Sequence, residues 1–362
     1  MTKAAELAKM GEVITNSQIG GRRNLIINGA MQVAQRSTSA TGLGAASGYF
    51  GLDRYKIFFN TAGRLTMTQT ADGPVGFANC LKLDCTTADT SIAATENIIL
   101  SQAIEAQDLQ QLKKGTSDAE KITLSFYVKG NANAGYTVEI YDGINDRRIG
   151  QTFSVTTDWT KVILTFPADT AGALADSNAT GLFINWWLHA GSNFTGGTFD
   201  TTWADYVQNR RVGNTTSFLD STDRTFFLTG VQLEVGSVAT PFEHRSFGEE
   251  LALCQRYYCE KSNVGGPFRA AGYGGGGTTG GFVYDFPVAM RAAPTGSLTI
   301  GEAISANNGA AATTVSGLAS AASNPHGSNP TLNGVGSYTG KGLSFYSDAA
   351  GDKTVFALDA EL

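Results

Sequence analysis

The stretch from residue 225 to residue 258 divides the chain into two parts. Its first half alternates apolar and polar positions with the period of a strand that has one buried face, and the positions predicted to be buried are Phe227, Thr229, Val231, Leu233 and Val235. Ser246 and Glu249 then have the spacing of a capping box, followed by apolar residues on one helical stripe. We therefore predict a strand that ends one domain and a helix that leads into the next.

Short apolar runs bounded by Gly, Asn, Asp or Pro predict further strands before this point. The segments are 25–27, 31–33, 49–59, 65–69, 98–100, 122–129, 136–141, 161–166 and 182–189. Residues 37–48 are predicted as loop, and residues 103–115 as the one convincing helix of this part, closed by Gly115. The pattern predicts a mainly β fold, with a jelly-roll or β-sandwich domain followed by a smaller β-domain.

The resulting domain prediction has three parts. Residues 1–24 hold a short helix-like piece, too short to be stable alone, which we interpret as an attachment or assembly segment. Residues 25–245 form the jelly-roll domain. Residues 246–362 contain the linking helix and the small β-domain, with expected strands at 281–286, 343–346 and 354–358 around the nearly uncharged segment 301–335.

Charge and cysteine usage narrow the classes of function. A net charge of −6 argues against a general nucleic-acid binder, and the three Arg-Arg pairs are interpreted as solvated or ion-paired surface features. No signal peptide or membrane span is expected, so we expect synthesis in the cytoplasm and no membrane insertion. The four cysteines and three histidines lack metal-site spacing, so we expect no cofactor, metal or disulfide.

Several segments resemble bacteriophage proteins. The elements RRNLIINGAMQVAQR, LDRYKI, LSFYVKG, LFINWWLHAGS and above all FFLTGVQLEVGSVATPFEHRSFGEELALCQRYY followed by FPVAMRAAPT are similar to tail-fibre and tail-associated structural proteins of phages of cyanobacteria and other marine bacteria. The resemblance covers roughly residues 12–300. It implies a first domain similar to jelly-roll carbohydrate-binding modules, a homotrimer located in the virion as part of the tail fibre, and adhesion to a host-surface polysaccharide. It supplies no catalytic motif.

The alternation of strand faces gives a candidate glycan site. If the predicted strands are neighbours in one sheet, its outer face carries a set of aromatic, amide and carboxylate side chains: Tyr127, Glu139, Tyr141, Asn185, Trp187, His189, Gln232 and Glu234. Aromatic rings stack on the apolar face of a pyranose, and polar groups bind its hydroxyls. The alternative is that the 103–115 helix or a neighbouring subunit covers this face. Trp203, in the 190–217 loop, is a further candidate.

Two adjacent tryptophans sharpen this prediction. Trp186 is expected to point into the core and Trp187 outward as an exposed sugar platform.

A homotrimer is predicted from two features of the sequence. Large apolar residues stand at 226 and 228, on the face of the dividing strand that the alternation assigns to solvent, and an amphipathic piece lies at 4–14. The N-terminal segment is expected to contact other phage tail or virion proteins.

Three alternatives remain open at the level of sequence. Glu139 and Glu234 could be the carboxylate pair of a virion-associated glycan depolymerase, if their separation allows it. Asp142, Asn145 and Asp146 could hold calcium, although a turn is the better interpretation. The chain could also be a capsid or tail decoration protein without a receptor of its own.

Overall fold

The computed structural model describes Lys3 and residues 22–213, 215–262, 269–275, 277–300, 304–307, 312–335, 342–347 and 354–362. The chain divides into two compact units, Met1–Glu250 and Leu251–Leu362. The finer division into 1–24, 25–245 and 246–362 stays a prediction, and nearly all of 1–24 lies outside the described residues. No described helix is long and apolar enough to cross a membrane.

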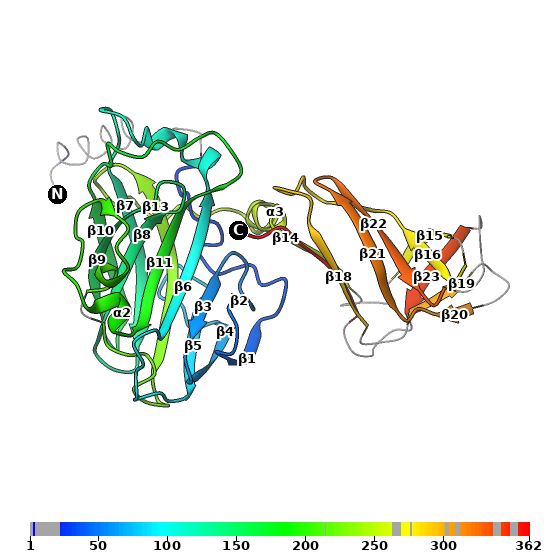
Figure 1. Cartoon of the computed structure of the whole chain (residues 1–362), viewed down its shortest axis with the longest axis horizontal. Coiled ribbons are helices and arrows are strands. Elements are labelled where there is room, and N and C mark those ends of the chain that lie inside the picture. The colour runs from blue at the N-terminus through cyan, green and yellow to red at the C-terminus, as the bar shows by residue number, and fades with distance from the viewer. Residues whose placement is uncertain are drawn as a thin grey trace. The chain divides into compact units, whose positions relative to one another are not determined.

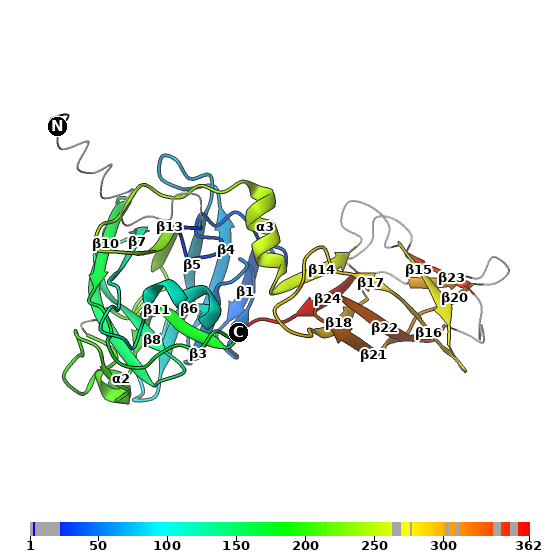
Figure 2. The same cartoon turned by 90° about the horizontal axis from the view of Figure 1, so that it is seen from above.

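The first unit is a β-sandwich of two antiparallel sheets, seen as two layers in Figure 2. The six-stranded sheet has the order β1 (Ser39–Leu43), β4 (Arg64–Thr70), β5 (Cys80–Thr87), β13 (Thr225–Val235), β7 (Ile122–Gly130) and β10 (Thr160–Phe166). The seven-stranded sheet has the order β12 (Ala204–Asp205), β9 (Arg147–Val155), β8 (Ala134–Asp142), β11 (Thr180–Ala190), β6 (Asn97–Glu105), β3 (Lys56–Asn60) and β2 (Gly48–Tyr49). The predicted mainly β, jelly-roll sandwich is confirmed.

The core lies between the inner faces of the two sheets, at the positions that alternate with the predicted outward residues. Leu182, Ile184, Trp186 and Leu188 of β11 are buried there, opposite Ile122, Leu124, Phe126 and Val128 of β7. The Trp186 ring contacts Phe126 edge to face at 5.8 Å. Burial of apolar area, to which such aromatic contacts add, is the main favourable term in forming the sandwich.

The face assignment on the dividing strand was wrong before residue 230 and correct beyond it, because β13 contains a bulge. Its pairing with β7 shifts between Thr229 and Gln232, around Gly230 at φ +61°. An extra residue reverses the facing of everything beyond it, so Phe226 and Leu228 enter the core together with Val231 and Leu233. Phe226 and Leu228 therefore give no support to a neighbouring subunit. The homotrimer stays a prediction from the resemblance and from the amphipathic piece at 4–14, which lies outside the described residues.

Local differences from the sequence prediction have physical reasons. Residues 25–31 and Val33 are buried but form no strand, with Asn28 and Met31 at positive φ. The segment 103–115 splits between the end of β6 and the 3-10 helix η1 (Ala106–Leu112). Strands β1, β5 and β9 were not predicted, because their apolar positions are few or interrupted by polar residues.

The second unit begins within α3 (Phe247–Gln255), whose capping box is confirmed by the Ser246 hydroxyl and the Glu249 carboxylate. One sheet has the order β14 (Tyr258–Ser262), β24 (Val355–Asp359), β18 (Thr295–Thr299). The other has the order β17 (Tyr284–Asp285), β22 (Gly327–Asn333), β16 (Thr279–Phe282), β15 (Arg269–Gly274), β23 (Gly342–Ser347), β19 (Ile304–Asn307), β20 (Ala312–Thr314), with β21 (Gly317–Asn324) also pairing β22 (Figure 1). Phe282, Phe345 and Phe356 centre its own core.

Candidate functional site

The predicted glycan face is not one surface. Glu139, Tyr141, Asn185, Trp187 and His189 lie on the paired strands β8 and β11 of the seven-stranded sheet. Tyr127, Gln232 and Glu234 lie on β7 and β13 of the other sheet. Apart from His189, which follows a bulge on β11 and pairs with the core residue Ile98, both groups face away from the shared core, so they lie on opposite outer faces of the sandwich. The prediction that these residues form a single site was therefore wrong.

Glu139 is the centre of a hydrogen-bond network on the seven-stranded sheet. Its carboxylate accepts two bonds from the Arg211 guanidinium, at 2.8 and 2.6 Å. Trp187 Nε1 donates to it at 3.0 Å and Asn185 Nδ2 at 3.1 Å, while the Ser101 hydroxyl bonds Asn185 Oδ1 at 2.7 Å. With Glu139 only 1% exposed, this polar network is internally satisfied and offers little to a ligand.

Trp187 is not an exposed platform. Its side chain is fully buried in a small cluster with Ile99 and Val212, with Phe194 at 5.1 Å and the Arg211 guanidinium at 4.6 Å from the ring. The cover is the chain's own segment 191–218, which includes α2 (Ser192–Thr195) and η2 (Gln208–Arg210), and Figure 2 shows α2 beyond the β8 and β11 layer. The sequence had suggested the 103–115 helix or a neighbouring subunit as the cover of this face, and the covering segment is neither of these.

The missed residue on this face is Arg211. The Arg-Arg pairs were interpreted as surface features, yet Arg148 is buried and pairs with Asp200 at 2.5 Å, and Arg211 is largely buried against Glu139. Burial alone would lower the pKa of Arg211, but the attraction of Glu139 raises it overall. No local signal in the sequence separates these buried arginines from solvated ones, because their partners lie more than 50 residues away.

His189 is also buried, beyond a bulge on β11 that shifts its pairing to Ile98, a residue of the sandwich core. Its Nδ1 is 2.8 Å from the Ser217 hydroxyl, and its Nε2 is 3.6 Å from Glu96. Burial lowers the pKa of His189, and the nearby Glu96 carboxylate opposes that shift only in part. The neutral imidazole therefore fixes Ser217, at the end of the covering segment, to β11.

Glu139 and Glu234 do not form a carboxylate pair, since they lie on the outer faces of different sheets. Glu234 is engaged by the Thr240 amide at 2.9 Å, the Thr240 hydroxyl at 2.6 Å and Gln232 Nε2 at 2.9 Å. The hypothesis of a depolymerase built on this pair was wrong.

The position where a calcium ion was considered is occupied by the side-chain ammonium of Lys114. Asp142 and Asp169 bind the Lys114 ammonium at 2.5 and 2.9 Å, and the carbonyl oxygens of Ala171 and Gly172 complete the surrounding oxygens at 3.1 and 2.8 Å. Asp142 also accepts bonds from the Ile144 and Asn145 amides, which makes the predicted turn. Among the described residues, no group of three or more His, Cys, Asp or Glu side chains could hold a metal ion.

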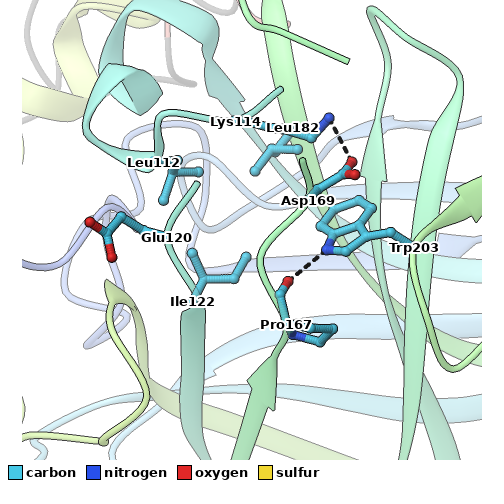
Figure 3. Close-up of a pocket in the computed structure, with 8 residues that line it drawn as sticks. All are labelled: Leu112, Lys114, Glu120, Ile122, Pro167, Asp169, Leu182 and Trp203. Carbon is cyan, nitrogen blue, oxygen red and sulfur yellow. Dashed lines mark hydrogen bonds and ion pairs between the residues drawn. The ribbon is translucent and has the colours of Figure 1, made fainter. Parts of the chain in front are cut away.

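Trp203 lies beside this lysine and apart from the other predicted site residues. Its ring is 5.3 Å from the Lys114 ammonium, and its Nε1 donates to the Pro167 carbonyl at 2.8 Å. Figure 3 shows Trp203 and Asp169 at a small pocket with Leu112, Ile122 and Leu182. The indole therefore closes one end of the sandwich core.

The outer face of the six-stranded sheet carries a different arrangement, which we call the aromatic platform: Phe77, Tyr127, Phe242 and His244. Phe77 is at its centre, 5.4 Å from Tyr127, 4.9 Å from Phe242 and 5.3 Å from His244 between ring centroids. The first three rings are half-buried, and His244 is exposed. In the part of the chain that the structure describes, neither the Tyr127 hydroxyl nor the His244 imidazole has a hydrogen-bond partner.

The bulge on β13 makes room for this platform. A Cβ atom at Gly230 would come within 2.7 Å of the Phe77 ring and 2.9 Å of the Tyr127 ring, and Gly230 already requires positive φ. Sequence reasoning found Tyr127 but missed Phe77, Phe242 and His244. Phe77 precedes the two others by more than 160 positions, so no local pattern could have grouped them.

No protein-family model matches the sequence, and no curated protein is significantly similar to it. Among solved structures, a CBM4 shares 14% identity over 57% of this chain and 97% of its own, with a TM-score of 0.31. A family 11 carbohydrate-binding module from Clostridium thermocellum, in complex with a mixed-linked tetrasaccharide, shares 10% over 56% of this chain and 99% of its own, with a TM-score of 0.29.

A third similar structure is the enzymatically active domain of tailspike protein 4 of bacteriophage CBA120. It shares 12% identity over 59% of this chain but only 21% of its own length, with a TM-score of 0.30. These structural neighbours are thus carbohydrate-binding modules and a phage tailspike domain. Identities this low, with TM-scores near 0.3, carry no argument about what this chain binds, and the assignment of the fold rests on its own sheet topology.

Proposed function

We propose that this chain is a phage virion structural protein of the tail-fibre kind, a homotrimeric adhesin whose β-sandwich binds a host-surface glycan at the aromatic platform. The observation that carries the proposal is the combination of clustered, partly exposed rings with unpaired polar tips at Tyr127 and His244. Rings supply the stacking surface for a pyranose, and unpaired donors and acceptors supply directional bonds to its hydroxyls.

The platform suits this role better than the originally predicted face does. On the seven-stranded sheet, Glu139, Asn185 and Trp187 bind one another and Arg211, so a ligand would have to displace existing bonds. At the platform a ligand would replace only water, which costs less. The location in the virion and the contact of the N-terminal segment with other tail proteins rest on the sequence resemblance, and antibody labelling of phage particles tests them.

Binding of the fluorescently labelled, full-length protein to an array of bacterial surface polysaccharides tests the glycan-binding role. We expect retention on at least one polysaccharide, and a loss of about fivefold or more in affinity for Tyr127→Ala and for Phe242→Ala, since stacking on one ring contributes on the order of 1 kcal/mol or more. The unfolding free energy of Tyr127→Ala should fall by about 1 kcal/mol or less, because the ring is only half-buried.

Tyr206→Ala is the matched control. Tyr206 is 37% exposed and lies over the opposite sheet, 5.8 Å from Tyr141. Its removal should leave glycan retention unchanged. Retention that survives both platform substitutions but is lost with Tyr206→Ala would assign the site to the seven-stranded sheet and contradict the proposal.

A further inference from the structure

The lysines on the outer face of the six-stranded sheet differ in their pairing. Lys82 pairs with Asp84 at 2.8 Å, and Lys129 pairs with Asp72 at 2.7 Å. Lys161, on the edge strand β10, is exposed, and within the described ranges it has no carboxylate partner. Its register partner on β7 is Tyr127, and its ammonium lies 5.9 Å from the Tyr127 ring centroid. An unpaired cation thus stands at the border of the aromatic platform.

The acidic groups nearest in the chain to the platform are already neutralised. Glu243 lies between Phe242 and His244, and it accepts bonds from the Arg23 and Asn24 amides and from Arg245. Burial alone would raise the pKa of Glu243, but these bonds lower it, so the carboxylate is held ionised and already bonded. Among the described residues no carboxylate forms an ion pair with Lys161. The chain as a whole carries a net charge of −6.

A ring stacked on Tyr127 and Phe77 would have Lys161 on one side, because Lys161 and Phe77 both contact Tyr127. A neutral sugar has only hydroxyls to present there, whereas a uronic acid presents a carboxylate attached to its ring. A bond between an ammonium and a carboxylate is about twice as strong as one between neutral groups. Placed over a half-buried ring, the lysine is also less hydrated than on an open surface.

The same face could accommodate more than one sugar unit. Lys129 lies two residues beyond Tyr127 on β7, about 7 Å along the strand, with its ammonium over the rings of Phe227 at 4.7 Å and Trp159 at 5.3 Å. A second aromatic group therefore continues the platform along the strand. An extended polysaccharide fits this arrangement better than a single terminal sugar does.

We propose that the aromatic platform recognises an acidic polysaccharide containing uronic acid units, with the unpaired Lys161 ammonium binding the sugar carboxylate beside Tyr127. This inference rests on the proposed glycan-binding function and specifies the class of glycan. Lys161 is a specificity residue in this scheme, and the rings provide the part of the affinity that acidic and neutral sugars share.

Binding of the full-length protein to three uronate polymers and their neutral methyl esters tests this inference. The probes are polygalacturonate, alginate and hyaluronan, and the measurement is isothermal titration calorimetry at 50 mM and 500 mM NaCl. At least one acidic polymer should bind about tenfold more tightly than its ester at low salt, and the preference should shrink at high salt because exposed charges are screened.

Three variants separate the two proposals. Lys161→Gln should remove the preference for the acid while leaving the affinity for the ester, and Tyr127→Ala should weaken both. Lys121→Gln removes the same charge from an exposed lysine six positions from Tyr127, about 20 Å along β7, and should change neither.

The other possible results of these experiments contradict either the uronate inference or both proposals. Binding of esters and acids with equal affinity, or a preference that survives Lys161→Gln, would overturn the uronate inference and leave glycan binding intact. Failure to bind any of the acidic polymers would also overturn the uronate inference. If Tyr127→Ala instead changes the oligomeric state measured by sedimentation, the platform is an interface between copies of the chain, and both proposals fall.

Discussion

The two outer faces of the sandwich carry similar side chains and differ in how those side chains are used. On the seven-stranded sheet, Glu139 accepts four hydrogen bonds from Arg211, Trp187 and Asn185 under a covering segment. On the six-stranded sheet, the rings of the aromatic platform stay partly exposed, and Tyr127 and His244 keep unpaired polar groups among the described residues. Residue type alone therefore does not identify a binding face. A binding face is better identified by accessible rings whose polar groups have no hydrogen-bond partner within the protein.

The strongest test of this contrast is the adjacent tryptophan pair. Trp187→Ala should destabilise the protein by about 3 to 5 kcal/mol, as much as Trp186→Ala, because both rings are fully buried. Urea unfolding followed by circular dichroism measures both. A stable Trp187→Ala variant that loses only glycan binding would mean that the covering segment opens and that the seven-stranded face is the binding face.

A substitution of Lys114 tests whether the ion-pair cluster of Lys114, Asp142 and Asp169 is satisfied within the protein, as the Glu139 network is. Lys114→Ala leaves Asp142 and Asp169 buried without their cation, which should cost about 3 to 5 kcal/mol. Because two carboxylates and two carbonyl oxygens remain, millimolar calcium should raise the melting temperature of this variant.

The parent chain provides the control for this experiment. Calcium and chelator should leave its melting temperature within a degree or two, since the lysine ammonium already occupies the oxygen cage. A parent chain that melts much earlier in chelator would show that a metal ion stabilises it. A Lys114→Ala variant that is indifferent to calcium would show that the cage collapses without the lysine.

The smallest of these effects concerns the attachment of the covering segment at His189. Because burial lowers the pKa of His189 in the fold, the unfolded chain binds more protons once the pH falls below the ordinary value of about 6.5. Stability should therefore be complete above that pH and decline toward the lowered pKa, by up to about 1.4 kcal/mol per pH unit. Urea unfolding at pH 7.5 and 5.5 should show a smaller decline for His189→Gln. Equal declines in both proteins would assign the pH dependence to other groups.

The local pattern predicted the faces of the strands wherever the alternation was regular. On β11 and β7 the inward positions form the core as expected, and the capping box at Ser246 begins α3. On β13 a single extra residue at Gly230 reversed the faces, and the sequence offered a glycine as the only sign. One-residue register changes are decided by the fit of a strand to its neighbours, which a pattern along one strand does not contain.

The sequence by itself determined the β-rich class, the alternation that builds the core, and the presence of aromatic and carboxylate residues on outward positions. Only the tertiary structure decided which outward residues share a face, which are covered, and which keep unpaired polar groups. The reason is distance along the chain: Glu139 meets Arg211 across 72 positions, and Phe77 meets Phe242 across 165. Contacts of that kind depend on how whole sheets pack, and no local preference specifies them.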